Sequence, residues 1–139
     1  MELEGKVAIV TGAGKGIGRA IAGAYAIEGA KLVLVSRTLE EVQDAGEEIS
    51  RFGIEPLPLS IDVSKPEQVD TMLASSINKF GSIDILVNNA AVLGPVGPFI
   101  QNDMAKWAET VNINVTGLAL CCKAVLPLMI KQNAGKIIN

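Results

Sequence analysis

The 139-residue sequence contains no histidine, and aromatic residues make up only 4% of it. The absence of histidine excludes Ser-His-Asp and Cys-His nucleophilic sites, an imidazole general base and every metal site with a histidine ligand. The shortage of aromatic rings disfavours the stacking surfaces that bind single-stranded nucleic acid. Charge of one sign is also lacking, because 12 basic and 15 acidic residues give a net charge of −3. This balance argues against broad contact with a phosphate backbone, and we expect no nucleic-acid partner.

Cysteine is scarce, and the two that occur, Cys121 and Cys122, are adjacent in an apolar stretch. They lack the spacing of metal ligands, and a bond between them would be strained, so we expect buried thiols in a reducing compartment. The segment Met1–Lys6 lacks the character of a signal or transit peptide. No apolar stretch reaches the roughly 18 residues that span a bilayer. These absences predict a cytoplasmic protein with no membrane partner.

What the sequence does contain favours one folded unit. Hydrophobic residues make up 49% of the chain and charged residues 19%, so burial can offset the entropy of the unfolded chain. The length is typical of a single hydrophobic core, and no linker, low-complexity tract or charge block marks a second one. We therefore expect residues 1–139 to form a single domain.

Short apolar runs alternate with longer segments that have helical spacing. The runs are Val7–Val10, Leu32–Val35, Leu57–Ile61 and Ile83–Val87, with Ile137–Ile138 as the opening of a fifth. Such runs, mostly β-branched or Leu, suit strands that are buried on both faces of a parallel sheet. A long helix, in one or two pieces, is expected from about Asp103 to Lys131. The pattern predicts a doubly wound α/β fold with a parallel sheet, incomplete at its fifth strand.

Two kinds of signal predict where helices begin and end. Thr38 with Glu41, and Ser64 with Glu67, have the spacing of a capping box at a helix amino terminus. Glycines, which accept a left-handed backbone, follow three of the predicted helices, at Gly29, Gly53 and Gly81.

The first apolar run leads into a glycine-rich turn over 11–18. Glycine lets the backbone turn tightly and approach a diphosphate, whose charge the amino terminus of the next helix stabilises. The position after the first strand of a strand–helix–strand unit favours dinucleotide binding over a plain tight turn. Because Lys15 is followed by Gly16, the turn is not a P-loop of an NTPase. The candidate diphosphate-binding residues are Gly12, Gly14, Lys15, Gly16, Ile17 and Gly18.

The chain resembles the classical short-chain dehydrogenase/reductase family along its whole length. The matching features are Thr11-Gly-x-x-x-Gly-x-Gly18, Asp62-Val63 after the third run, Asn88-Asn89-Ala90-Ala91 after the fourth, and Trp107 followed by Asn114 and Gly117. The resemblance implies a Rossmann fold and a nicotinamide-dependent oxidoreductase that interconverts a carbonyl and a secondary alcohol. The family usually has Gly where this chain has Ala91, and we expect cofactor binding to survive the added methyl group.

The end of the second run bears on the choice of nicotinamide cofactor. NAD-binding relatives place a carboxylate there for the ribose hydroxyls, whereas this chain has Ser36, Arg37 and Thr38. The Arg37 guanidinium can bind a 2′-phosphate, and Lys15 would approach the same phosphate from the other side, with Ser36 and Thr38 as hydroxyl donors. The alternative is that both cations are solvated surface charges. The pattern predicts NADP(H).

The resemblance also assigns residues to the rest of the cofactor. Asp62 would accept a hydrogen bond from the adenine amino group and the Val63 backbone would contact the ring, although Asp62 could instead cap the turn before Ser64. The residues expected along the ribose are Asn88, Asn89, Ala90 and Ala91, although Asn88 could instead tie neighbouring strands together. Asn114 would take part in catalysis by holding a relay water through its backbone carbonyl.

The family's chemistry further needs a Ser, a Tyr and a Lys four residues after that Tyr. The only tyrosine here is Tyr25, which we expect to pack inside the first helix. We interpret the chain as the amino-terminal part of a longer reductase; the alternative is a non-catalytic dinucleotide-binding or sensing module. A methyltransferase that uses S-adenosylmethionine is a further alternative. It would need an acidic residue at the end of the second run, and Ser36 and Arg37 at that place argue against it. The expected partners are a small-molecule carbonyl or alcohol substrate and further copies of the chain, packed on the long helix, in a homo-oligomer.

Overall fold

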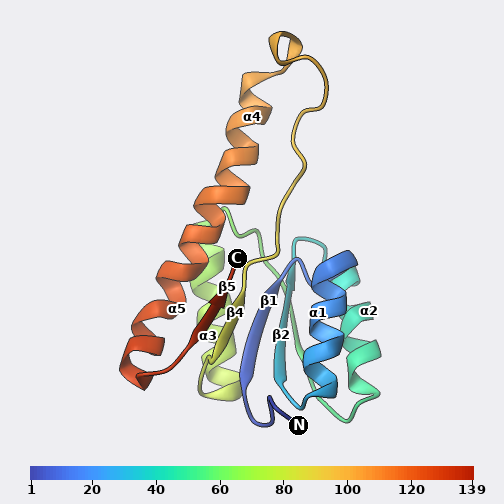
Figure 1. Cartoon of the computed structure of the whole chain (residues 1–139), viewed down its shortest axis with the longest axis vertical. Coiled ribbons are helices and arrows are strands. Elements are labelled where there is room, and N and C mark those ends of the chain that lie inside the picture. Colours follow the sequence, from blue (N-terminus) through green and yellow to red (C-terminus); the bar gives the residue numbers. More distant parts are fainter.

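Five parallel strands form one sheet in the order β3-β2-β1-β4-β5 in the computed structural model, which describes residues 1–139 (Figure 1). The strands are β1 (Val7–Thr11), β2 (Lys31–Ser36), β3 (Leu57–Ser60), β4 (Ile85–Val87) and β5 (Lys136–Ile138). The order reverses between β1 and β4, which creates a switch point at the carboxyl ends of these strands. The predicted doubly wound parallel fold is confirmed. The fourth strand, Ile85–Val87, is shorter than the predicted run Ile83–Val87, because Ile83 and Asp84 lie in the loop before it.

Helices cover both faces of the sheet (Figure 1). They are α1 (Gly16–Ile27), α2 (Leu39–Ser50), α3 (Pro66–Phe80), α4 (Met104–Val111) and α5 (Leu118–Gln132), with a short 3-10 turn at Phe99–Gln101. A π-helical turn, Asn112–Gly117, joins α4 to α5 in one continuous rod. The long helix predicted from Asp103 is therefore a single helix with an irregular centre, and Asp103 caps it by accepting from the Ala105 amide at 2.8 Å.

The core lies in two layers, because alternate strand residues face opposite sides of the sheet. Ala8, Val10, Leu32 and Leu34 pack with the buried faces of α1 and α2. Ile9, Val33, Val35 and Leu86 pack on the other side with the buried faces of α3 and α5. Both faces of β1 and β2 are thus buried, as the apolar runs predict. On the long helix, where copies of the chain are predicted to pack, Val125 is buried in this core and Val115 is exposed.

Neither capping box forms, although Thr38 stands at the amino-terminal boundary of α2 as predicted. The Thr38 side chain makes no capping bond, because Ser36 Oγ accepts from the Thr38 amide at 3.1 Å and donates to Glu41 at 3.3 Å. The helix α3 begins with Pro66, which has no N–H to cap, and Ser64 turns back towards Asp62. The helix-terminal glycine predictions are confirmed, since all three have a left-handed backbone, with φ of 83°, 79° and 81° at Gly29, Gly53 and Gly81.

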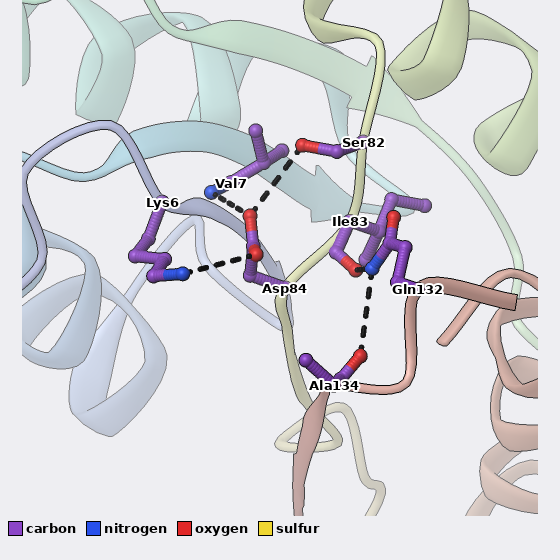
Figure 2. Close-up of polar contacts among 7 residues, drawn as sticks. All are labelled: Lys6, Val7, Ser82, Ile83, Asp84, Gln132 and Ala134. Carbon is purple, nitrogen blue, oxygen red and sulfur yellow. Dashed lines mark hydrogen bonds and ion pairs between the residues drawn. The ribbon is translucent and has the colours of Figure 1, made fainter. Parts of the chain in front are cut away.

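A polar cluster holds the amino ends of the strands, away from the switch point (Figure 2). The Asp84 carboxylate accepts from the Val7 amide at 2.9 Å, from Lys6 Nζ at 3.5 Å and from Ser82 Oγ at 3.4 Å. Gln132 Nε2 donates to the Ile83 carbonyl at 3.0 Å, which ties the end of α5 to the same region. These contacts join β1 to β4 and leave the carboxyl ends of the strands to form a site.

The continuous helix Met104–Gln132 is 29 residues long and is apolar enough, by length and composition, to cross a membrane. The expectation that no segment meets this criterion is therefore wrong, because the few polar residues between Asn112 and Lys131 do not lower the average enough. A core helix of a water-soluble protein satisfies the same test. The α5 part buries Cys121, Val125 and Met129 against the sheet layer.

Candidate functional site

A cavity of about 240 Å³ opens at the carboxyl ends of β1, β2, β3 and β4. Its lining residues are Gly12, Gly14, Lys15, Val35, Ser36, Arg37, Thr38, Glu41, Ile61, Asp62, Val63, Asn89, Ala90, Ala91 and Ile113. Most of the residues predicted to bind a cofactor come together here from four separate loops. Gly16, Ile17 and Gly18 lie outside the lining, and the Ile17 side chain is exposed.

The glycines of the turn have different physical roles. Gly12 has φ of 67°, and a Cβ at this position would lie 2.7 Å from Asn89 Nδ2. A Cβ at Gly18 would collide with the Gly12 carbonyl, so this glycine lets α1 begin directly against the turn. Gly16 has φ of 55° but faces open space. The turn therefore requires Gly12 and Gly18 for close packing and Gly16 for its backbone conformation.

Thr11 and Asn89 lock the turn to the end of β4. The buried Thr11 hydroxyl donates to the Val87 carbonyl at 3.2 Å and accepts from the Asn89 and Ala90 amides, each at 3.0 Å. Asn89 Nδ2 donates to the carbonyls of Thr11 and Gly12 at 3.1 and 3.2 Å. Asn89 thus holds the switch point together in addition to lining the cavity. This locking role of Thr11 was not predicted; its signal in the sequence is a polar residue that ends a buried apolar run.

Asn88 links the end of β4 to the end of β5. Its Nδ2 donates to Asn139 Oδ1 at 2.8 Å and contacts Cys122 Sγ at 3.3 Å, while its Oδ1 is buried without a partner. Both cysteines are free thiols, and burial, with a smaller effect of the neighbouring Cys122, raises the pKa of Cys121 to about 12. Cys121 is therefore a core residue, not a reactive thiol.

The end of β2 gathers charged groups beside the cavity. The Arg37 guanidinium is exposed and makes no hydrogen bond or ion pair with the protein, whereas Lys15 Nζ lies 3.4 Å from Glu41 Oε1. Glu41 also accepts from Ser36 Oγ at 3.3 Å. The predicted convergence of Lys15 and Arg37 on one point is therefore interrupted by a carboxylate. Glu41 was predicted only as a capping residue, and its place in the cavity was not predicted because it depends on the packing of α2 on the glycine turn.

One carboxylate oxygen of Asp62 is hydrogen-bonded within the protein and the other is not. Its Oδ1 accepts from the Ser64 amide at 2.9 Å and the Ser64 hydroxyl at 2.7 Å, so the turn-capping role is present, while Oδ2 has no protein partner. Partial burial raises the pKa of this carboxyl, but the Ser64 hydrogen bonds and the charges of Arg37 and Lys65 outweigh that effect and hold its pKa below the ordinary value. The carboxylate therefore stays ionised and keeps one oxygen free to accept.

Asn114 lies in the π-helical turn and not on the cavity wall, which its neighbour Ile113 lines. Its side chain bonds both main-chain groups of Val92, with Nδ2 donating at 2.8 Å and Oδ1 accepting at 2.9 Å. Three residues further on, a Cβ at Gly117 would lie 2.8 Å from Val63 Cγ2, so the rod passes close to the loop after β3. A π turn of this kind is common at functional sites.

Comparison with known proteins gives a consistent picture. A family model described as short chain dehydrogenase matches residues 6–139. A 3-oxoacyl-[acyl-carrier-protein] reductase of Synechocystis sp. is 38% identical over 138 residues, which cover 99% of this chain and 56% of that protein. An uncharacterised oxidoreductase of Thermotoga maritima is 36% identical over 137 residues, 99% of this chain and 53% of that one. The chain spans about half the length of the curated relatives it matches.

Solved structures agree with the fold. An NAD+-bound xylitol dehydrogenase superposes with a TM-score of 0.95 at 36% identity, covering 99% of this chain and 53% of that one. A metagenomic short-chain oxidoreductase in complex with NADP has a TM-score of 0.95 at 34% identity, covering 100% of this chain and 63% of that one. Similar folds therefore hold either nicotinamide dinucleotide, and the choice depends on individual side chains.

Proposed function

The chain belongs to the short-chain dehydrogenase family, and from that premise we propose that its cavity binds NADP(H) for the interconversion of a carbonyl and a secondary alcohol. The bound cofactor would supply or accept the hydride. The substrate is expected to be a small molecule. We also propose that the protein is cytoplasmic and forms a homo-oligomer.

The observation that carries the choice of cofactor is the unpaired Arg37 guanidinium at the cavity wall. The second strand ends in Ser36, so no carboxylate stands at the strand end where one would repel a 2′-phosphate. A free guanidinium binds phosphate with charge-assisted and often bidentate hydrogen bonds. The nearby amino terminus of α2, which starts at Leu39, adds a favourable dipole.

The other cavity residues fit the remaining parts of a dinucleotide. The glycine turn brings backbone close to the start of α1, which suits a diphosphate. Asp62 offers a charged oxygen without a protein partner, as needed to accept from an adenine amino group. Thr11 and Asn89 keep the loops on either side of the switch point at a fixed separation.

A non-catalytic dinucleotide-binding module is the second candidate function, and Tyr25, which does not line the cavity, is not placed to act as a proton donor there. Carbonyl reduction leaves an alkoxide that must receive a proton from a positioned acid. Tyr25, the only tyrosine, lies in α1 and packs against the core layer below α1 and α2. We expect the 139-residue polypeptide to bind NADPH without carbonyl turnover. A longer polypeptide that adds Ser and Tyr-x-x-x-Lys should turn over, and should lose activity when that Tyr becomes Phe.

The proposal is tested by reversing the charge of Arg37. Arg37→Asp should weaken NADPH binding by about 2 kcal/mol or more, roughly 30-fold, because a charge-assisted contact is replaced by repulsion. Affinity for NADH should change far less. Arg51→Asp, at the far end of α2, makes the same charge change away from the cavity and is the control. An equal loss in both variants would show a non-specific charge effect, and circular dichroism checks that each is folded.

A further inference from the structure

Glu41 places a carboxylate among the hydrogen-bond donors that a 2′-phosphate needs. Its Oε1 lies 3.4 Å from Lys15 Nζ and its Oε2 accepts from Ser36 Oγ at 3.3 Å. Both donors line the cavity and both were expected to serve the phosphate. In this structure they are bound to Glu41 instead, and Arg37 is the cation left without a partner.

The packing of α2 on the glycine turn fixes where Glu41 stands. A Cβ at Gly14 would lie 2.7 Å from the Glu41 Cβ, so the glycine turn and α2 are in contact at this point. The Glu41 side chain is 34% exposed, whereas that of Lys15 is 81% exposed. The Lys15 side chain can therefore change its rotamer more freely than that of Glu41, whose Cβ is held against the glycine turn.

We propose that Glu41 is a specificity-determining residue that opposes Arg37 in the choice between the two cofactors. To bind NADP(H), whose 2′-phosphate carries a charge of about −1.5 to −2, the site must release Lys15 and Ser36 from Glu41 and accept repulsion from its carboxylate. NAD(H) has no such phosphate and leaves the bridge Lys15–Glu41–Ser36 intact. The preference for NADP(H) is therefore smaller than two free cations would produce. This inference rests on the proposed function.

Glu41→Gln tests the proposal with little change in shape, because the amide oxygen can still accept from Ser36. Removing the charge should tighten NADP+ binding by about three- to tenfold, the size expected for a partly exposed charge acting on a phosphate. NAD+ affinity should change by less than about twofold, because NAD+ has no 2′-phosphate to bind beside Glu41. Isothermal titration of the folded 139-residue chain with NADP+ and with NAD+ measures both constants.

Glu40→Gln is the matched control, because Glu40 precedes Glu41 in the first turn of α2, is exposed and does not line the cavity. It removes the same charge from the same helix terminus. Equal tightening of NADP+ in both variants, equal tightening of NADP+ and NAD+ by Glu41→Gln, or no change in NADP+ would overturn the role of Glu41. In those cases wild-type binding of NADP+ leaves the proposed function standing. Wild-type protein that binds neither nucleotide would overturn both.

Discussion

The Asn114 side chain pairs with both main-chain groups of Val92, donating from Nδ2 at 2.8 Å and accepting on Oδ1 at 2.9 Å. This pair attaches the loop after β4 to the centre of the long helical rod. It also accounts for an asparagine at a helical position, where the residue type alone has a mild propensity cost. Asn114 is therefore a positioning residue for the loop between β4 and α4, whatever its backbone carbonyl contributes to catalysis.

Replacing Asn114 with Ala should lower the free energy of unfolding by about 1–3 kcal/mol, because two half-buried main-chain groups of Val92 lose their partners. Asn112→Ala, in the same π turn but exposed and without side-chain hydrogen bonds, should change it by no more than about 0.5 kcal/mol. Urea unfolding followed by circular dichroism measures both variants. Similar losses at the two positions would mean that helix propensity, and not the Val92 pair, governs the effect.

Two glycines of α1 should respond to alanine with opposite signs. Gly18→Ala should lower the free energy of unfolding by about 1–3 kcal/mol, because the new methyl group meets the Gly12 carbonyl and lies 2.5 Å from Asn89 Nδ2. Gly23→Ala should stabilise it by roughly 0.5–1 kcal/mol, because nothing lies within 4 Å of its added Cβ and alanine favours the helix.

Thermal unfolding of the two glycine variants gives the comparison directly. If Gly18→Ala unfolds at or above the wild-type midpoint, α1 does not start in close contact with the glycine turn. The dinucleotide titration of the same variant should show weakened binding, since the shift of Asn89 also moves the loop after β4.

Asp62 should make stability depend on pH in the acid range. Its pKa in the folded protein lies below the ordinary value of 3.8, so the carboxylate contributes stability above about that pH. The contribution is lost as pH falls through the folded-state pKa. Asp62→Asn keeps an acceptor for Ser64 but removes the titration. The difference in free energy of unfolding between wild type and this variant should therefore shrink as the pH is lowered from 5 to 3.

Denaturant midpoints at pH 7, 5 and 3 follow this difference, with Asp44→Asn on the exposed face of α2 as the control for net charge. A wild-type advantage that stays constant, or grows, as the pH is lowered would contradict the lowered pKa of Asp62.

The parts of the molecule that could be predicted from the sequence are those that follow from local pattern. Buried apolar runs of four or five residues predict strands, and a glycine turn after the first run predicts a switch-point site. The residues that escaped prediction act through contacts distant in sequence. Glu41 meets Lys15 only because α2 packs on the glycine turn, and Asn114 meets Val92 across 22 positions.

The wrong helix start predicted at Ser64 has a similar origin. A spacing such as Ser64 with Glu67 describes a capping box only when the serine stands at the helix boundary, and Pro66 moves that boundary to Lys65. The π turn over Asn112–Gly117 was not predicted either. The predicted sites of contact with the cofactor itself remain predictions.

A titration of the wild-type 139-residue chain with NADPH and with NADH, under identical salt and followed by nucleotide fluorescence, tests the proposed choice of cofactor most directly. We expect saturable one-to-one binding of both nucleotides, with NADPH the tighter. Tighter binding of NADH, or no binding of either nucleotide by the folded protein, would contradict it.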